Sequence, residues 1–144
     1  WQRNFRINTD AVFVSMQAAF RLMPPTGGGS IVNVSSIAGI RAASYMAAYS
    51  ASKAAMIQLS AVAAIEGAPL GIRVNCIGPV AWTPAMEKSA EGSPVFLEGR
   101  LIDRTPLRRI GEPDEIAGAA LLLASKAGSF ITGQAIVVDG GVTI

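Results

Sequence analysis

The stretch Ser30-Ile31-Val32-Asn33-Val34 is rich in β-branched residues, and a second such run follows it as Gly71-Ile72-Arg73-Val74-Asn75-Cys76-Ile77. Runs of this kind are typical of buried strands. Residues 47–66 lie between them, are rich in alanine and are followed by Gly67 and Pro69, so they predict a helix. Its larger apolar residues form a stripe at helical spacing: Met56, Leu59, Val62 and Ile65. A strand, a helix and a strand in this order predict two parallel strands.

The flanking sequence continues the same alternation. Residues 5–23 carry apolar side chains at helical spacing and end at Pro24 and Pro25, which predicts a helix before the first strand. Residues 113–125 predict another helix, and residues 134–139 predict a third strand. This order of elements predicts an α/β fold with a parallel sheet, whose strands are expected to be buried on both faces.

Residues 84–111 are irregular, with short helices expected at 85–90 and 96–103. A loop of this length inside a compact domain is usually functional or mobile. Its apolar residues suggest a partial cover for a pocket: Pro84, Ala85, Met86, Phe96 and Leu97.

The composition excludes several kinds of chemistry. The chain has 144 residues, 51% of them hydrophobic and 15% charged, which indicates a single globular unit and not a disordered chain. It has one cysteine and no histidine, so a Ser-His-Asp triad, a Cys-His pair and a histidine-ligated metal are all absent. Acid–base chemistry must therefore use carboxylates, lysine, tyrosine or cysteine.

The charge and hydropathy patterns point to no macromolecular partner. The net charge is only +2, and the basic residues are scattered apart from Arg104, Arg108 and Arg109. A nucleic-acid partner is therefore not expected. The longest apolar stretch, residues 117–124, is far shorter than a membrane span of about 20 residues. Since no signal peptide is visible either, we expect a cytoplasmic protein that binds neither membrane nor nucleic acid.

The cluster Tyr49-Ser50-Ala51-Ser52-Lys53 is the main candidate for chemistry. Tyr49 and Lys53 are four residues apart near the start of a predicted helix, so they share a face. An ammonium group beside a phenol stabilises the phenolate and makes it a better proton donor and acceptor. Taken alone, however, this spacing occurs by chance on many helices.

Two further segments are expected to lie close to Tyr49 and Lys53. Ser36 comes just after the first strand, and residues 75–84 follow the second. In parallel α/β sheets, ligands bind beyond the carboxyl ends of the strands, where Tyr49 also begins its helix. A serine hydroxyl there can hydrogen-bond a substrate oxygen as its charge changes, although Ser36 taken alone is better explained as a loop hydroxyl.

These segments together resemble the short-chain dehydrogenase/reductase family along nearly the whole chain. Asn8 matches the asparagine of the family's catalytic helix, and Ser36 precedes Tyr49 by 13 residues, the usual interval. Tyr49 and Lys53 match the Tyr-x-x-x-Lys motif. Three longer stretches also match: Arg73-Val74-Asn75, residues 106–116 and residues 130–141.

The resemblance implies a Rossmann-like, doubly wound parallel sheet and hydride transfer between NAD or NADP and an alcohol or carbonyl compound. Tyr49 would be the general acid/base, Lys53 would support Tyr49 and bind the nicotinamide ribose, and Ser36 would hold the substrate oxygen. Asn8 would anchor a water that links Lys53 to solvent. Cofactor contacts are expected from Tyr49, Lys53, Pro79, Val80 and Thr83, no metal is implied, and a homo-oligomer (dimer or tetramer) is expected.

The chain departs from the family pattern in two respects. Val80 stands where the family usually has glycine, and Thr83 comes one residue early, which puts the backbone near the nicotinamide in doubt. The glycine-rich half of the family fold is not in residues 1–144, so the sheet is expected to hold about three strands. The run Gly27-Gly28-Gly29 does not replace it, because it follows a helix and opens a strand, which is typical of a flexible turn.

Two hypotheses therefore remain. In the first, residues 1–144 are a partial domain of an NAD(P)-dependent oxidoreductase that uses Asn8, Ser36, Tyr49 and Lys53. In the second, they form a non-catalytic fragment that self-associates or assembles with partner chains. Cofactor binding separates the two.

Overall fold

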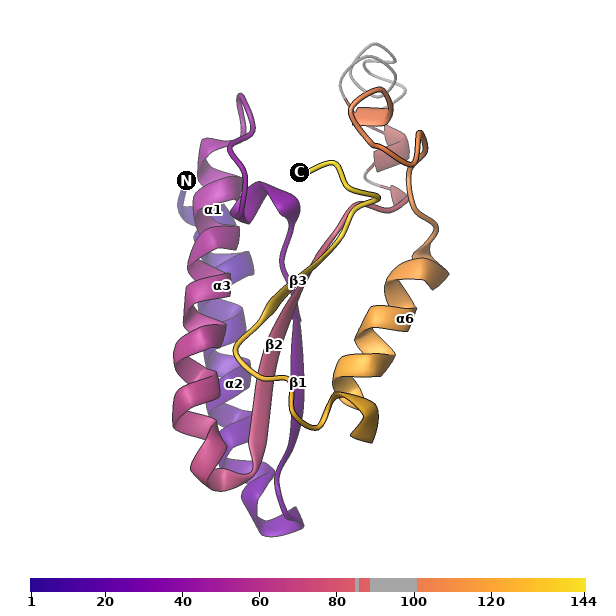
Figure 1. Ribbon diagram of the computed structural model, residues 1–144. Coiled ribbons are helices and arrows are strands. Elements are labelled where there is room, and N and C mark those ends of the chain that lie inside the picture. Colours follow the sequence, from indigo (N-terminus) through magenta and orange to yellow (C-terminus); the bar gives the residue numbers. More distant parts are fainter. Residues whose placement is uncertain (85, 89–100) are drawn as a thin grey trace.

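The computed structural model describes residues 1–84, 86–88 and 101–144, and these form three layers (Figure 1). The sheet in the described part has three parallel strands in this order: β1 (Gly29–Val34), β2 (Ile72–Pro79) and β3 (Ala135–Val138). Helices α2 (Ala11–Leu22) and α3 (Ala47–Gly67) lie on one side of the sheet, and α6 (Pro113–Ala124) lies on the other. The predicted α/β fold with parallel strands is confirmed.

The N-terminal helix is continuous but not uniform. It begins with α1 (Gln2–Phe5), passes through a π-helical segment at Arg6–Asp10 and continues as α2. Pro24 and Pro25 follow, as the sequence predicts, and form a short 3-10 turn. The π-helical segment was not predicted. Such widened turns are frequent at functional sites, and this one contains Asn8.

Burial differs sharply between the strands. β2 is paired on both sides and is almost entirely buried, with Val74 and Asn75 at 0% exposure. No residue of β1 is fully buried, and Val34 is 54% exposed. The prediction that all strands are buried on both faces was therefore wrong for β1 and β3. Within the described residues each of them pairs with β2 alone, so neither is enclosed as β2 is.

The main core lies between α2, α3 and the sheet. Its buried members are Met16, Ala63, Ala64, Ile72 and Val74. The predicted apolar stripe of α3 was only partly right, because Met56 is buried but Val62 and Ile65 are exposed. Small side chains form the packed face instead and allow the close approach of α3 to α2 and the sheet.

Short helices fill several connections: Pro24–Thr26, Ile37–Gly39, Ala68–Leu70 and Lys126–Gly128. The helices predicted at 85–90 and 96–103, and the apolar cover that includes Ala85, Phe96 and Leu97, fall largely outside the described residues. Of the helices in the described residues, none is both long and apolar enough to span a membrane.

Candidate active site

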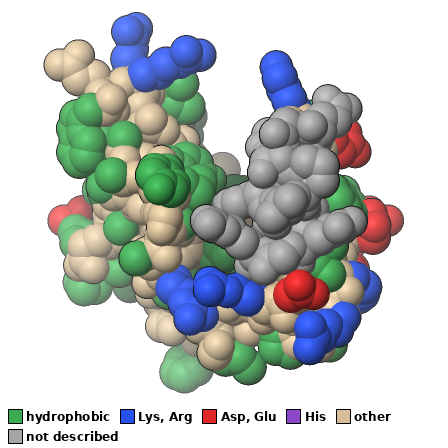
Figure 2. Space-filling view, turned by 90° about the horizontal axis from the view of Figure 1, so that it is seen from above, with side chains coloured by type: hydrophobic (Ala, Val, Ile, Leu, Met, Phe, Trp, Pro, Cys, Tyr) green, Lys and Arg blue, Asp and Glu red, His purple; other side chains and the backbone are tan. Residues whose placement is uncertain are grey.

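A cleft of about 920 Å³ opens at the carboxyl ends of β1 and β2, the upper end of the molecule in Figure 1. Viewed from above, this end is hollowed, with hydrophobic side chains on one wall and Lys or Arg side chains at its rim (Figure 2). The predicted site residues that line the cleft are Ser36, Tyr49, Lys53, Pro79, Val80 and Thr83. Asn8 is the one predicted site residue that does not line it.

Ser36 follows β1 directly and has an extended backbone, with φ −165° and ψ 155°. Its Oγ accepts a hydrogen bond from the backbone N–H of Ala38 at 3.1 Å and so begins the short helix Ile37–Gly39. A serine hydroxyl that accepts one bond still has its own proton to donate. Ser36 is therefore fixed at the cleft wall with a donor for an oxygen of a bound molecule.

Lys53 is a buried cation on the first turns of α3, 9% exposed. Its Nζ donates to the carbonyl oxygen of Val34 at 2.8 Å and lies 5.8 Å from the centre of the Tyr49 ring. Burial lowers the pKa of Lys53 from its usual value, because it disfavours the charged ammonium. The Val34 carbonyl and the aromatic face partly offset this penalty and keep the cation beside Tyr49.

Asn8 lies outside the cleft and contacts the candidate site through Ser52. The Asn8 amide Nδ2 donates to Ser52 Oγ at 3.0 Å, and Ser52 Oγ donates to the backbone carbonyl of Tyr49 at 2.8 Å. Thr9 Oγ1 donates to the Ser52 carbonyl at 3.1 Å. The π-helical segment is thus joined to the turn of α3 that carries Tyr49 and Lys53.

Sequence reasoning treated Ser52 only as a small residue, but it is completely buried at this junction. We expect Ser52→Ala to lower the free energy of unfolding by about 1–3 kcal/mol, because the partly buried Asn8 amide would lose its acceptor. Denaturant unfolding followed by circular dichroism measures this.

Ser50 provides the matched control for that experiment. Its Oγ is also buried, but it has no hydrogen-bond partner among the described residues. Ser50→Ala should therefore leave stability unchanged or slightly raised. Equal losses in the two variants would show that the hydrogen bonds of Ser52 do not stabilise this junction.

The segment after β2 forms the opposite wall. Val80 donates its N–H to Val138 at 2.9 Å, and its side chain is buried with Ile110 and Val142. Val80 does not have the positive φ that would favour glycine, so valine is accommodated there without backbone strain. Thr83 Oγ1 accepts from the N–H of Met86 at 3.1 Å, which fixes its hydroxyl at the cleft.

Cys76 lies beneath this site and is 1% exposed. Its Sγ donates to Ser60 Oγ at 3.2 Å, and burial raises the pKa of the thiol. Because the thiolate is the reactive form, Cys76 fits a packing role and not a nucleophilic one. The described residues also contain no cluster of three or more His, Cys, Asp or Glu side chains that could hold a metal ion.

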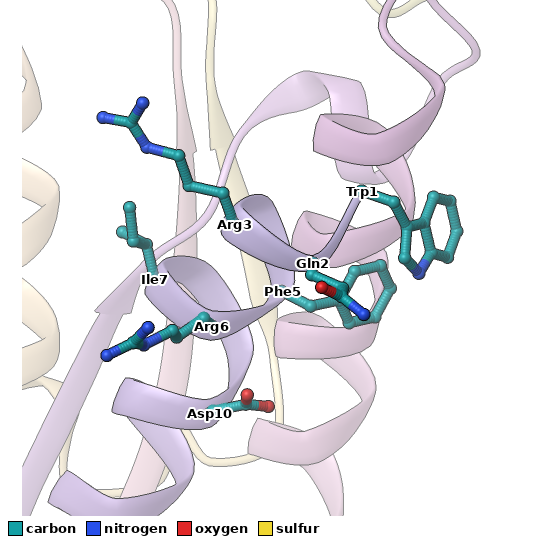
Figure 3. Close-up of a pocket in the computed structure, with 7 residues that line it drawn as sticks. All are labelled: Trp1, Gln2, Arg3, Phe5, Arg6, Ile7 and Asp10. Carbon is teal, nitrogen blue, oxygen red and sulfur yellow. The ribbon is translucent and has the colours of Figure 1, made fainter.

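A second hollow, of about 880 Å³, lies along the N-terminal helix (Figure 3). Trp1 and Phe5 stack there with their ring centres 4.8 Å apart. Figure 3 shows Arg3, Arg6 and Ile7 pointing to the other side of the helix from these rings. A binding site needs polar groups that point toward one another. Arg3 and Arg6 point away from the stacked rings, so this surface is not the candidate site.

Comparisons with known proteins show the family to which this fold belongs. The family model described as "Enoyl-(Acyl carrier protein) reductase" matches residues 1–143. Galactitol 2-dehydrogenase (L-tagatose-forming) of Cereibacter sphaeroides is 40% identical over 146 residues, which cover 100% of this chain and 57% of that protein. A short-chain type dehydrogenase/reductase from Mycobacterium ulcerans superimposes with a TM-score of 0.91 at 36% identity, covering 99% of this chain and 51% of the other. The chain belongs to the short-chain dehydrogenase/reductase family.

A second solved structure gives the same fold for this short-chain dehydrogenase/reductase. The 7α-hydroxysteroid dehydrogenase complexed with NADH and 7-oxo glycochenodeoxycholic acid has a TM-score of 0.87 at 35% identity, covering 95% of this chain and 53% of that one. The chain therefore spans about half the length of the relatives it matches. The recognition of the family and of its Rossmann-like fold from sequence is confirmed.

Proposed function

We propose that this protein is an NAD(P)-dependent oxidoreductase that interconverts an alcohol and a ketone or aldehyde. The observation that carries the proposal is the presence of Ser36, Tyr49 and Lys53 in one cleft at the carboxyl ends of parallel strands. Its relatives are dehydrogenases and reductases, which supports oxidoreduction in general.

The residues of the cleft fit a dinucleotide at its nicotinamide end. Lys53 brings a cation, Tyr49 and Thr83 bring hydroxyls, and Val80 contributes to an apolar wall. In this proposal Lys53, Tyr49, Pro79, Val80 and Thr83 contact the cofactor. The bound cofactor supplies or accepts the hydride at its nicotinamide ring.

The chain's own residues handle the oxygen and the proton. In reduction, the Ser36 hydroxyl donates to the carbonyl oxygen and polarises it, and Tyr49 gives its phenolic proton to that oxygen. In oxidation, the phenolate of Tyr49 takes the proton of the alcohol. The Lys53 ammonium beside the ring stabilises the phenolate in both directions.

In this mechanism Asn8 supports the site from outside the cleft. The proposed role of holding a water that links Lys53 to solvent would fall to its amide oxygen, since its amide nitrogen is bound to Ser52. Its bond to Ser52 also orients the turn of α3 that carries Tyr49 and Lys53.

The test begins with cofactor binding, because a non-catalytic assembly piece would not bind it. Purified protein is titrated with NADH and with NADPH by fluorescence, and then assayed with a panel of alcohols and ketones. Saturable binding and turnover of at least one panel member are expected. Absence of both would reject the oxidoreductase in favour of the non-catalytic fragment.

We also propose that the protein forms a homo-oligomer, a dimer or a tetramer. Large apolar side chains are exposed on both outer layers of the fold: Ile65 on α3 at 76%, and Leu121 on α6 at 70%. Exposed apolar surface of this kind favours association. Light scattering should give a mass of two or four chains, and a monomer at micromolar concentration would contradict the proposal.

A further inference from the structure

We infer that the substrate carries a carboxylate, which Arg41 binds at the mouth of the cleft. This inference rests on the proposed oxidoreductase function and specifies its substrate class as hydroxy or oxo acids. Arg41 lies between Ser36 and Tyr49 in the chain and lines the same cleft as both. Nothing in the sequence pattern distinguishes it from the other arginines.

The position of the Arg41 guanidinium is fixed by a contact far along the chain. Its Nη1 donates to the backbone carbonyl oxygen of Val142 at 3.0 Å. A guanidinium has five N–H donors in one plane, so this bond leaves most of them for another acceptor. Arginine is well suited to a carboxylate because two of its parallel N–H groups match the two oxygens.

The acceptor that holds Arg41 is itself fixed. Asp139 is buried, and its two carboxylate oxygens accept the N–H groups of Gly141 at 2.8 Å and Thr143 at 2.9 Å. Between them, Val142 is 8% exposed and packs with Val80 and Ile110. A rigid acceptor of this kind preorganises the guanidinium and lowers the entropy lost when a ligand binds.

The charge of the described part of the cleft lining favours an anion. Its described lining includes three cations, Arg41, Lys53 and Arg104, and no Asp or Glu. Lys53 is already bound to the Val34 carbonyl beside Tyr49. Asp139 lies nearby, but both of its oxygens are directed to backbone N–H groups. Arg41 is therefore the cation that is both oriented and available at the mouth.

The test compares short-chain hydroxy acids with their methyl esters, using whichever of NAD and NADP the protein binds. The wild-type protein should prefer each acid over its ester by about tenfold or more in kcat/KM, mainly through KM. Arg41→Gln should remove this preference, because it should raise KM for the acids much more than KM for the esters. Arg41→Lys, which keeps the charge but loses the planar pair of donors, should retain part of it.

Arg108→Gln is the matched control, because Arg108 is an exposed arginine outside the cleft whose guanidinium lies 3.9 Å from Asp103. It should keep the full preference for acids. The melting temperature of each variant shows whether loss of the Val142 contact disturbs the fold. If Arg41→Gln is unstable, the preference of Arg41→Lys for acids over esters is measured in its place.

Equal turnover of acids and esters by the wild-type protein would overturn the inference. So would a preference for acids over esters that survives Arg41→Gln. A third contrary result would be a weaker affinity of Arg41→Gln for NADH with no change in KM for the acids. The last would assign Arg41 to the cofactor phosphates. Turnover of neutral substrates alone would leave the proposed function intact, whereas no turnover of any substrate would reject both.

Discussion

Tyr49→Phe is expected to lower kcat for both oxidation and reduction by about a hundredfold or more, the usual contribution of a positioned general acid or base. The substitution removes only the phenolic oxygen. The ring that lies 5.8 Å from the Lys53 ammonium remains, so the packing at the start of α3 should be preserved. The rate is measured at saturating substrate with the preferred cofactor.

Two further measurements on Tyr49→Phe distinguish loss of the phenolic proton from damage to the cofactor site or the fold. NADH or NADPH affinity, measured by fluorescence, should change by less than about threefold, because most of the binding surface is intact. The melting temperature should also be unchanged. Turnover that stays within a factor of a few of the wild-type value would show that another group moves the proton, and the assignment of Tyr49 would fail.

Much of the fold follows from local sequence. Strands β1 and β2 and helix α3 were predicted from β-branched runs and an alanine-rich stretch, and their limits agree with the structure to within about two residues. The incomplete burial of β1 was not predictable in this way. A short apolar run looks the same in a strand with two neighbouring strands and in a strand with one, because pairing depends on residues elsewhere in the chain.

The residues of the candidate site were likewise only partly predictable from the sequence. Ser36, Tyr49 and Lys53 were singled out by type and spacing, and the structure places all three at one cleft. Ser52 and Arg41 were not singled out, since their importance comes from partners 44 and 101 residues away, Asn8 and Val142. Such pairs leave no periodic signal, and only the folded chain reveals them.

A substitution in the turn before β1 is expected to have the second large effect, a loss of stability. Gly28 has φ +93°, and a Cβ placed on it would lie only 2.1 Å from the carbonyl oxygen of Gly71. Gly29 donates its N–H to that same oxygen at 3.0 Å, at the point where β1 and β2 begin side by side. The close approach of these two backbones therefore requires glycine at this position.

We expect Gly28→Ala to lower the free energy of unfolding by at least about 3 kcal/mol, measured by denaturant unfolding, because the clash is with backbone and cannot be relieved by a rotamer change. Gly27→Ala is the matched control, since Gly27 has φ +90° but nothing within 4 Å of its Cβ position. It should lose only about 1–2 kcal/mol, the conformational penalty alone. Equal losses would mean that the two strands separate easily at this end. The predicted difference means that this glycine run is not simply a flexible turn, because Gly28 sets the start of the sheet on which the cleft is built.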